Sequence, residues 1–396
     1  MGRGRELFAW ALLVVFGVAL GFGTIEVGVR ALHLVPDRFW RADADLGWRH
    51  TPGESGWWTQ EDREFTIPIH INAQGLRDVD HAYEKPTGVE RVMLLGDSFI
   101  EALQVPLADT ITRRLQAALG QHVEVIGTGV SGYGTASELL FLRREGLRYD
   151  PDVVVLGFYP GNDVKNNSPT LEDTLRPVYD SHGRLLRVEQ PAGLRGGLSQ
   201  ERKGWRAHLR SYQYIRQLIL RHPGLAAPLH RLGLMRATGP RTAPERDGIP
   251  VDYWVFAPQP DGEWQLAWAR TEGLLDEMRA TLAEAHKHFI VMLIPTRYEV
   301  YPDSWQQTIA VYPAMRNQTW DPTAPRERML AWCQAHAVLC LDLYPAFRAA
   351  AGGAAPLYFH HDGHWTAAGH AVAAKGLAEF LLQQRLVPTS QKEKDR

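Results

Sequence analysis

The sequence predicts an α/β protein built on a parallel sheet with helices on both faces. From about residue 90 onward, short runs of apolar residues alternate with stretches of helical periodicity. The runs are apolar throughout, as expected of strands buried on both faces. The chain has 396 residues, 45% hydrophobic and 22% charged, which is typical of globular proteins and gives two to three domains at about 150 residues each. Disordered, collagen-like and coiled-coil classes are excluded.

Charge and cysteine content narrow the class further. Lysine and arginine number 43 against 45 acidic residues, for a net charge of -2, so no overall positive field attracts DNA or RNA. Two cysteines, Cys333 and Cys340, are too few for a disulfide scaffold or a zinc ribbon. They flank a predicted helix-to-strand turn. In an oxidising compartment they can form one disulfide, and two buried thiols are the alternative.

The amino-terminal run from Leu7 to Ile25 carries no charge. At about 1.5 Å rise per helical residue it nearly covers a hydrocarbon layer of about 30 Å. It is longer than the apolar region of about 7–15 residues in a signal peptide, and it offers only a poor cleavage site. We therefore favour an uncleaved, single-pass inner-membrane anchor over a cleaved signal. Basic residues flank the run almost equally, and we expect the large domain on the periplasmic side, because long domains cross largely regardless of charge.

We expect four regions along the chain. They are an anchor (1–33), a β-rich preamble (34–89) with a proline-interrupted strand, a main domain (90–386) with an insertion at about 166–262, and a polar tail (387–396). The predicted strands of the main domain are 92–95, 123–126, 153–158, 289–294 and 338–343, and its helices are 110–119, 136–147, 266–286, 326–336 and 367–383. In such sheets ligands bind outside the carboxyl ends of the strands.

The insertion is strongly basic. Between Arg195 and Arg246 there are eleven lysines and arginines and two acids. Two interpretations are open: a solvated surface of the insertion, or a cap that faces anionic headgroups or an anionic polymer.

Three strand ends carry polar residues suited to chemistry. The first core strand ends in GDSF, which places Ser98 where a nucleophile or a helix cap can stand. The second is followed by Gly127–Gly134, a match to G-x-G-x-x-G; a dinucleotide site is disfavoured because this is not the first strand-helix unit and an exported domain has little reduced nicotinamide cofactor available. After the third strand comes Asn162, whose amide can donate to developing negative charge or form an ordinary turn.

The segment HHDGHW, residues 360–365, precedes the last helix. Its histidines and aspartate could bind a metal, but their spacing is not a usual ligand pattern. We prefer a general base held by a carboxylate, because a serine needs an imidazole to take its proton. No metal or cofactor is therefore expected. The chain lacks a G-x-S-x-G elbow, which excludes the α/β-hydrolase fold.

In this order, the four segments resemble the SGNH/GDSL hydrolase family over residues 90–164 and 266–386. The resemblance implies a flavodoxin-like three-layer sandwich. The run INAQGLRD (71–78) and the anchor are similar to the membrane-anchored bacterial branch of that family.

The resemblance also implies a role for one residue in each segment. Ser98 is the implied nucleophile and His364 the implied base. The oxyanion hole would consist of the Ser98 and Gly132 N–H groups and the Asn162 side chain.

The spacing at the base departs from the family pattern. The family usually has D-x-x-H, but here that position is His361, and Asp362 stands two residues before the base. Residues two apart in an extended stretch point the same way, so we expect Asp362 to orient His364. The D-x-H-W run is also similar to the alginate O-acetyltransferase relatives of the superfamily.

We therefore expect a serine esterase that cleaves an O-acetyl or short acyl ester at the cell envelope. Its substrate would be an ester, such as an acylated carbohydrate or lipid. An O-acyltransferase acting on an envelope or extracellular polysaccharide would use the same residues. A non-catalytic envelope scaffold is the alternative from another class. The acceptor, the acyl chain length and the oligomeric state stay open.

Overall fold

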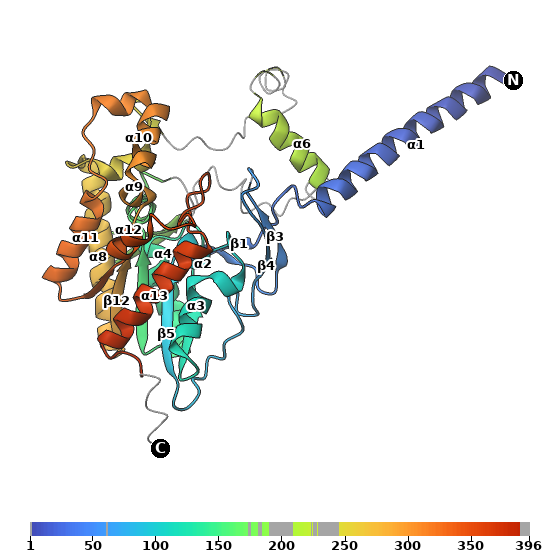
Figure 1. The fold of residues 1–396 in the computed structure, drawn as a ribbon. Coiled ribbons are helices and arrows are strands. Elements are labelled where there is room, and N and C mark those ends of the chain that lie inside the picture. The colour runs from blue at the N-terminus through green and yellow to red at the C-terminus, as the bar shows by residue number, and fades with distance from the viewer. Residues whose placement is uncertain are drawn as a thin grey trace.

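The computed structural model describes residues 2–60, 62–172, 176–180, 184–189, 209–222, 224, 228 and 245–388. Five parallel strands form the central sheet (Figure 1). They are β5 (Glu90–Gly96), β6 (Val123–Gly127), β7 (Val153–Phe158), β12 (His288–Leu293) and β13 (Leu339–Asp342). Their spatial order is β6-β5-β7-β12-β13, the flavodoxin-like order 2-1-3-4-5. The predicted fold class is thus confirmed, and the strand order reverses between β5 and β7.

Helices cover both faces of the sheet, and the strands divide their side chains between two cores. On β5, Val92 and Leu94 belong to one core, whereas Met93 and Leu95 belong to the other, because successive side chains of a strand point to opposite faces. The first core is closed by α3 (Ile111–Leu119), α12 (Tyr344–Ala350) and α13 (Ala367–Gln383), the second by α4 (Thr135–Arg144), α8 (Gly262–Glu284) and α11 (Ala324–Ala335). The two layers lie on opposite sides of the strands in Figure 1.

The predicted elements of the main domain are present with shifted ends. The largest shift is in α8, which begins at Gly262, before the predicted start at residue 266. Helix α4 stops at Arg144 before a 3₁₀ turn, Gly146–Tyr149, whose C-cap Asp150 is left-handed. Three α-helices after β12 were not predicted: α9 (Arg297–Val300), α10 (Pro302–Val311) and α12. The first is too short to show periodicity. Its start is fixed instead by a capping box between Thr296 and Glu299.

The preamble consists of two antiparallel hairpins. The first joins β1 (Trp40–Asp43) to β2 (Gly47–His50), and the second joins β3 (Ser55–Thr59) to β4 (Thr66–His70), which lies within the predicted strand. A small core of Phe39, Ile69, Ile71 and Leu103 joins the preamble to the main domain. These hairpins pack beside the carboxyl end of β5, where the sequence places Ser98.

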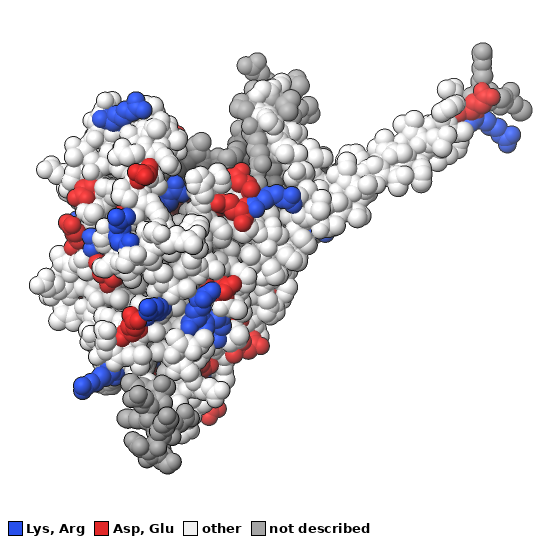
Figure 2. All heavy atoms as spheres, viewed as in Figure 1, with Lys and Arg blue, Asp and Glu red and all other residues white. Residues whose placement is uncertain are grey.

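Helix α1 (Gly2–Ala31) projects from the body and shows no charge along its middle (Figures 1 and 2). Its segment Arg5–Ala31 is long and apolar enough to cross a membrane, and none of its most apolar window is buried; a signal sequence has the same features. Near its end, the Glu26 carboxylate accepts hydrogen bonds from the N–H groups of Arg210 and Ser211 at 3.0 and 2.8 Å. These residues begin α6 (Arg210–Arg221), so the N-terminus of α6 contacts the C-terminal end of α1.

The insertion is described in part. Besides α6 it contains the hairpin β8 (Arg176–Tyr179) with β9 (Leu185–Glu189) and the short pair β10 (Glu245–Arg246) with β11 (Ile249–Pro250). Most of the basic stretch 195–246 and nearly all of the tail lie outside the described residues.

The two cysteines are free thiols, so the disulfide considered for them is not formed. Cys333 lies near the end of α11 and Cys340 on β13. The intervening turn does bring them together, and a hydrogen bond to Cys333 together with burial raises the pKa of the Cys340 thiol. Two neighbouring thiols take the place of the bridge.

Candidate active site

Ser98 stands at the first position of the four-residue helix α2 (Ser98–Glu101), directly after β5. Asp97 caps this helix, and its carboxylate accepts the Phe99 N–H at 2.9 Å. The strand must end in glycine, because a side chain at Gly96 would lie 2.4 Å from Ile100 Cγ1. The first N–H groups of a helix have no acceptor within it. The Ser98 N–H therefore has no acceptor within α2.

His364 reaches Ser98 from the loop before α13. Its Nε2 lies 2.7 Å from Ser98 Oγ, and its Nδ1 lies 2.6 Å from Asp362 Oδ1. Because a carboxylate only accepts, Nδ1 carries the proton and Nε2 is left to accept from the serine hydroxyl. The structure thus joins the three residues in one continuous hydrogen-bonded chain.

Asp362 opposes the effect of burial on the pKa of His364. Burial by itself lowers the pKa of His364, but the hydrogen bond and charge of Asp362 outweigh it and raise the pKa above the usual 6.5. His361 is turned elsewhere: its side chain is 53% exposed, with Nδ1 3.9 Å from Asp62. The aspartate two residues before the histidine, and not the residue at the usual family position, therefore contacts the base.

The glycine-rich loop after β6 runs beside α2. A side chain at Gly129 would lie 2.2 Å from the backbone nitrogen of Glu101, so this glycine allows the loop to approach α2 closely. Gly132 has φ +78°, a left-handed conformation that favours glycine. Its carbonyl oxygen accepts a hydrogen bond from Asn166 at 3.2 Å. Close packing and backbone conformation, rather than a dinucleotide phosphate, thus account for these glycines.

Asn162 follows β7 as the N-cap residue of α5 (Asp163–Asn166). Its Nδ2 donates to Asp97 Oδ2 at 2.9 Å. An amide nitrogen carries two hydrogens, so this bond leaves the second one unused. Burial raises the pKa of Asp97, although the bonds from Phe99 and Asn162 act in the opposite direction. Asp163 accepts the Tyr159 N–H at 2.7 Å and so ties this loop together.

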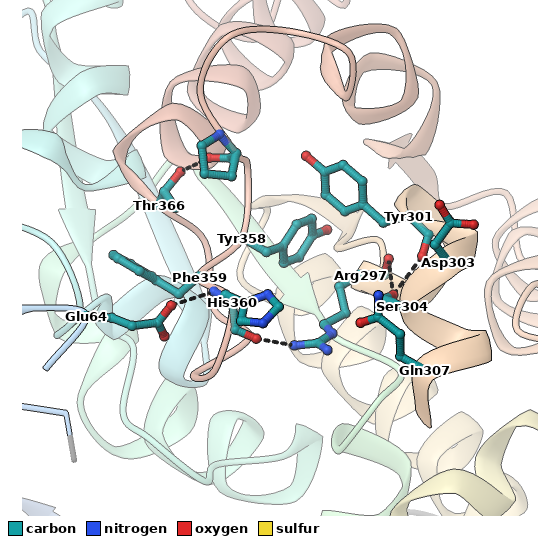
Figure 3. Close-up of a pocket in the computed structure, with 11 residues that line it drawn as sticks. Glu64, Arg297, Tyr301, Asp303, Ser304, Gln307, Tyr358, Phe359, His360 and Thr366 are labelled. Carbon is teal, nitrogen blue, oxygen red and sulfur yellow. Dashed lines mark hydrogen bonds between the residues drawn. The ribbon is translucent and has the colours of Figure 1, made fainter. Parts of the chain in front are cut away.

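The loop that carries the base is held from outside by Glu64, a residue that the sequence did not single out. Glu64 accepts the N–H groups of His360, His361 and Asp362 at 2.7, 2.9 and 2.9 Å. On the other side, Arg297 Nη1 donates to the His360 carbonyl at 3.0 Å (Figure 3). No local sequence pattern predicts the Glu64 contact, because it joins residues nearly three hundred positions apart.

A pocket of about 390 Å³ opens beside this loop. Figure 3 shows Tyr301, Tyr358 and Phe359 on its sides, with Asp303 and Gln307 from α10. Mixed aromatic and polar walls next to the base loop suit a ligand with both apolar and hydroxyl groups. Within the described ranges, no three His, Cys, Asp or Glu residues are grouped so as to hold a metal ion.

The carboxyl-terminal part of the chain is similar to a known family. Residues 251–395 match the sequence model of a family described as the SGNH hydrolase-like domain of the acetyltransferase AlgX. The resemblance to SGNH/GDSL hydrolases is thereby confirmed. The match includes the base loop and α13, while the Ser98 segment lies before it. A search of the curated proteins finds no match.

Several solved structures are similar at low identity. An alpha/beta hydrolase enzyme from the metagenome of Lake Arreo, Spain, is 16% identical with a TM-score of 0.37, over 78% of this chain and 100% of that one. A catalytic mutant of an acetylxylan esterase from Geobacillus stearothermophilus is 12% identical with a TM-score of 0.37, over 75% and 96%. A GDSL-like lipase from Bacteroides thetaiotaomicron is 13% identical with a TM-score of 0.35, over 77% and 91%.

Proposed function

We propose that this protein is a serine-dependent acyl-transfer enzyme that cleaves an O-acetyl or short acyl ester through an acyl-Ser98 intermediate. The observation that carries the proposal is the continuous chain from Ser98 Oγ to His364 to Asp362, with bonds of 2.7 and 2.6 Å. A serine hydroxyl alone is a weak nucleophile. An adjacent imidazole held by a carboxylate is the arrangement that activates it.

In the proposed first step, Ser98 Oγ attacks the ester carbonyl carbon while its proton moves to His364 Nε2. The negative charge on Asp362 stabilises the imidazolium that forms. The carbonyl oxygen becomes an oxyanion that accepts from the Ser98 and Gly132 N–H groups and the free Asn162 amide hydrogen. Each such donor contributes about 3 kcal/mol to lowering the barrier.

In the second step the tetrahedral species collapses. The bond to the leaving alcohol breaks, and His364 returns the proton to the alcohol oxygen. An acceptor hydroxyl then attacks the acyl-Ser98 carbonyl, with His364 taking its proton, and Ser98 is released by the reverse sequence. With water as the acceptor the enzyme is an esterase.

A second acceptor is favoured by one observation. The family model that matches residues 251–395 describes an acetyltransferase, so a carbohydrate hydroxyl is the alternative to water. We place the reaction at the cell envelope, with α1 as a membrane anchor and the catalytic domain on the extracytoplasmic side. The length of the apolar segment of α1 and the exposure of its most apolar window support this placement.

One experiment tests the proposal. The full chain in detergent is incubated with a fluorophosphonate probe and, separately, with an acetyl ester plus either water or an oligosaccharide. We expect covalent labelling at Ser98, and mass analysis of both products identifies the acceptor. An absence of labelling and of ester turnover would support the non-catalytic scaffold instead.

A further inference from the structure

The peptide unit that contains the Gly132 N–H accepts a hydrogen bond from an indole at its carbonyl oxygen. Trp48, on β2 of the preamble, donates its Nε1–H to the carbonyl oxygen of Ser131 at 3.0 Å. This oxygen and the Gly132 N–H belong to the same peptide unit. In a planar trans peptide the C=O and N–H point in opposite directions. A donor that fixes the Ser131 oxygen therefore also fixes the direction in which the Gly132 N–H points.

Trp48 forms hydrogen bonds with the residues on both sides of Gly132, Ser131 and Tyr133. In return for the bond from Trp48, Tyr133 donates its hydroxyl to the Trp48 carbonyl at 2.6 Å, and the two rings pack edge to face at 5.6 Å. The Trp48 ring also lies against Gly132 itself, 3.2 Å from where a side chain would begin. Trp48 is only 6% exposed. The position of Gly132 is thus set by the residues before and after it.

A buried carboxylate joins this loop to the helix that carries the nucleophile. Glu101, the last residue of α2, accepts the Ser131 hydroxyl on one oxygen. Its other oxygen accepts from Trp40 Nε1 at 2.9 Å and from His50 Nε2 at 2.5 Å, both on the β1–β2 hairpin. Glu101 is 1% exposed. A buried carboxylate with three donors forms charge-assisted hydrogen bonds that resist displacement.

We propose that Trp48 is a positioning residue that aims the Gly132 N–H at the oxyanion, and that Glu101 supports it by fixing Ser131. This inference rests on the proposed function. It assigns the β1–β2 hairpin, which lies outside the family's four sequence segments, a part in transition-state stabilisation. A bond donated to the Ser131 oxygen also polarises the peptide and strengthens the Gly132 N–H as a donor.

Trp48→Phe in the full chain tests this inference, because phenylalanine keeps an aromatic ring there and removes the N–H. We expect kcat to fall about 10–100-fold, since a slightly misplaced donor loses part of its effect, with KM changed less than about twofold. The midpoint of the acid limb of the pH profile should not move, because Trp48 does not contact His364.

Trp320→Phe is the matched control. Trp320 Nε1 also donates to a backbone carbonyl, that of Met315 at 2.8 Å, but Trp320 stands just before α11 and, among the described residues, contacts none that is assigned to the candidate site. This variant should retain normal kcat. A Trp48 analogue with sulfur in place of the indole N–H removes the donor and keeps a bicyclic ring of similar shape, and it replaces Trp48→Phe if that variant does not fold.

The outcomes separate the two proposals. If Ser98→Ala is inactive while both Trp48 variants keep normal kcat, the positioning role is wrong and the proposed function stands. An unchanged kcat with a raised KM would also overturn it, because the effect would then be on substrate binding. If Ser98→Ala retains full activity, the proposed function itself fails.

Discussion

The two halves of the candidate site are built differently. The serine half, with Ser98, Gly132 and Asn162, stands on strand ends and is braced by buried groups, above all Asp97 and Glu101. The histidine half is a loop. The side chains of His364 and Asp362 are 26% and 17% exposed, and the loop is held through its backbone by two residues, Glu64 and Arg297.

This difference fits the tasks proposed for the two halves. Oxyanion donors stabilise a transition state only if they are fixed in advance, since any reorganisation during the reaction costs free energy. A base must instead exchange protons with the serine, the leaving group and the acceptor, and so it needs access to the substrate side. We therefore expect changes in the serine half to act mainly on kcat, and changes in the loop to act on the protonation or the stability of His364 as well.

The largest effect is expected at the point where the halves meet. Ser98→Ala should abolish ester cleavage and fluorophosphonate labelling, because no other hydroxyl contacts His364 Nε2 in the part of the chain that the structure describes. The fold should survive, since the change removes one hydroxyl group and very few packing contacts. Circular dichroism and thermal unfolding check the fold, and persistent labelling would remove Ser98 from the mechanism.

Asp362→Asn should come next, with kcat lowered about 10⁴-fold by the wrong imidazole tautomer. The acid limb of the residual activity should also move. The pKa of His364 is raised by Asp362 and lowered by burial, so the wild-type base becomes neutral, and active, only as pH rises through a midpoint above 6.5. Without the carboxylate that midpoint should shift to lower pH.

His361→Ala is the control for this change, because His361 is exposed and turned toward Asp62. Its turnover per folded molecule should be close to normal. A severe loss in His361→Ala, together with near-normal activity in Asp362→Asn, would reverse the assignment.

Asn162→Ala should lower kcat about 10²–10³-fold with a modest effect on KM, because its amide acts mainly on the developing oxyanion. Steady-state kinetics with an acetyl ester measure both constants. A change in KM alone would argue against the oxyanion role and would weaken the contrast between the two halves.

The smallest effect on kcat is expected for Glu64, which binds the backbone of the loop before His364. Glu64→Gln removes the charge from three hydrogen bonds to the backbone of residues 360–362; we expect stability to fall by about 1–2 kcal/mol and kcat by about tenfold or less. Asp62→Asn is the control, since Asp62 is 58% exposed and its carboxylate makes only a long contact, 3.9 Å, with His361 Nδ1. Denaturant unfolding and kinetics on both variants test this, and equal values for the two would contradict a supporting role for Glu64.

The sequence predicts those features of the fold and of the site that depend on local patterns. Strands such as β7 are apolar throughout, so their ends, and with them Ser98 and Asn162, can be located from the sequence. Parallel strands put those ends at one edge, which brings the polar segments together. The contacts of Glu64 and Trp48 were not predicted, because they depend on how the preamble hairpins pack against loops far away in the chain. Helix α9 was missed because four residues are too few to show a period.

The connection between Ser98 and His364 spans 266 residues, and that between Glu64 and Asp362 spans 298. Bringing such distant segments together costs loop-closure entropy, and high contact order slows folding. At a synthesis rate of about 5–20 residues per second, roughly 13–55 s separate the appearance of the nucleophile from that of its base. A nascent or truncated chain that stops short of residue 364 therefore has a serine without a proton acceptor. The proposed activity needs both Ser98 and His364, so it can arise only after residue 364 has been synthesised and the two segments have come together.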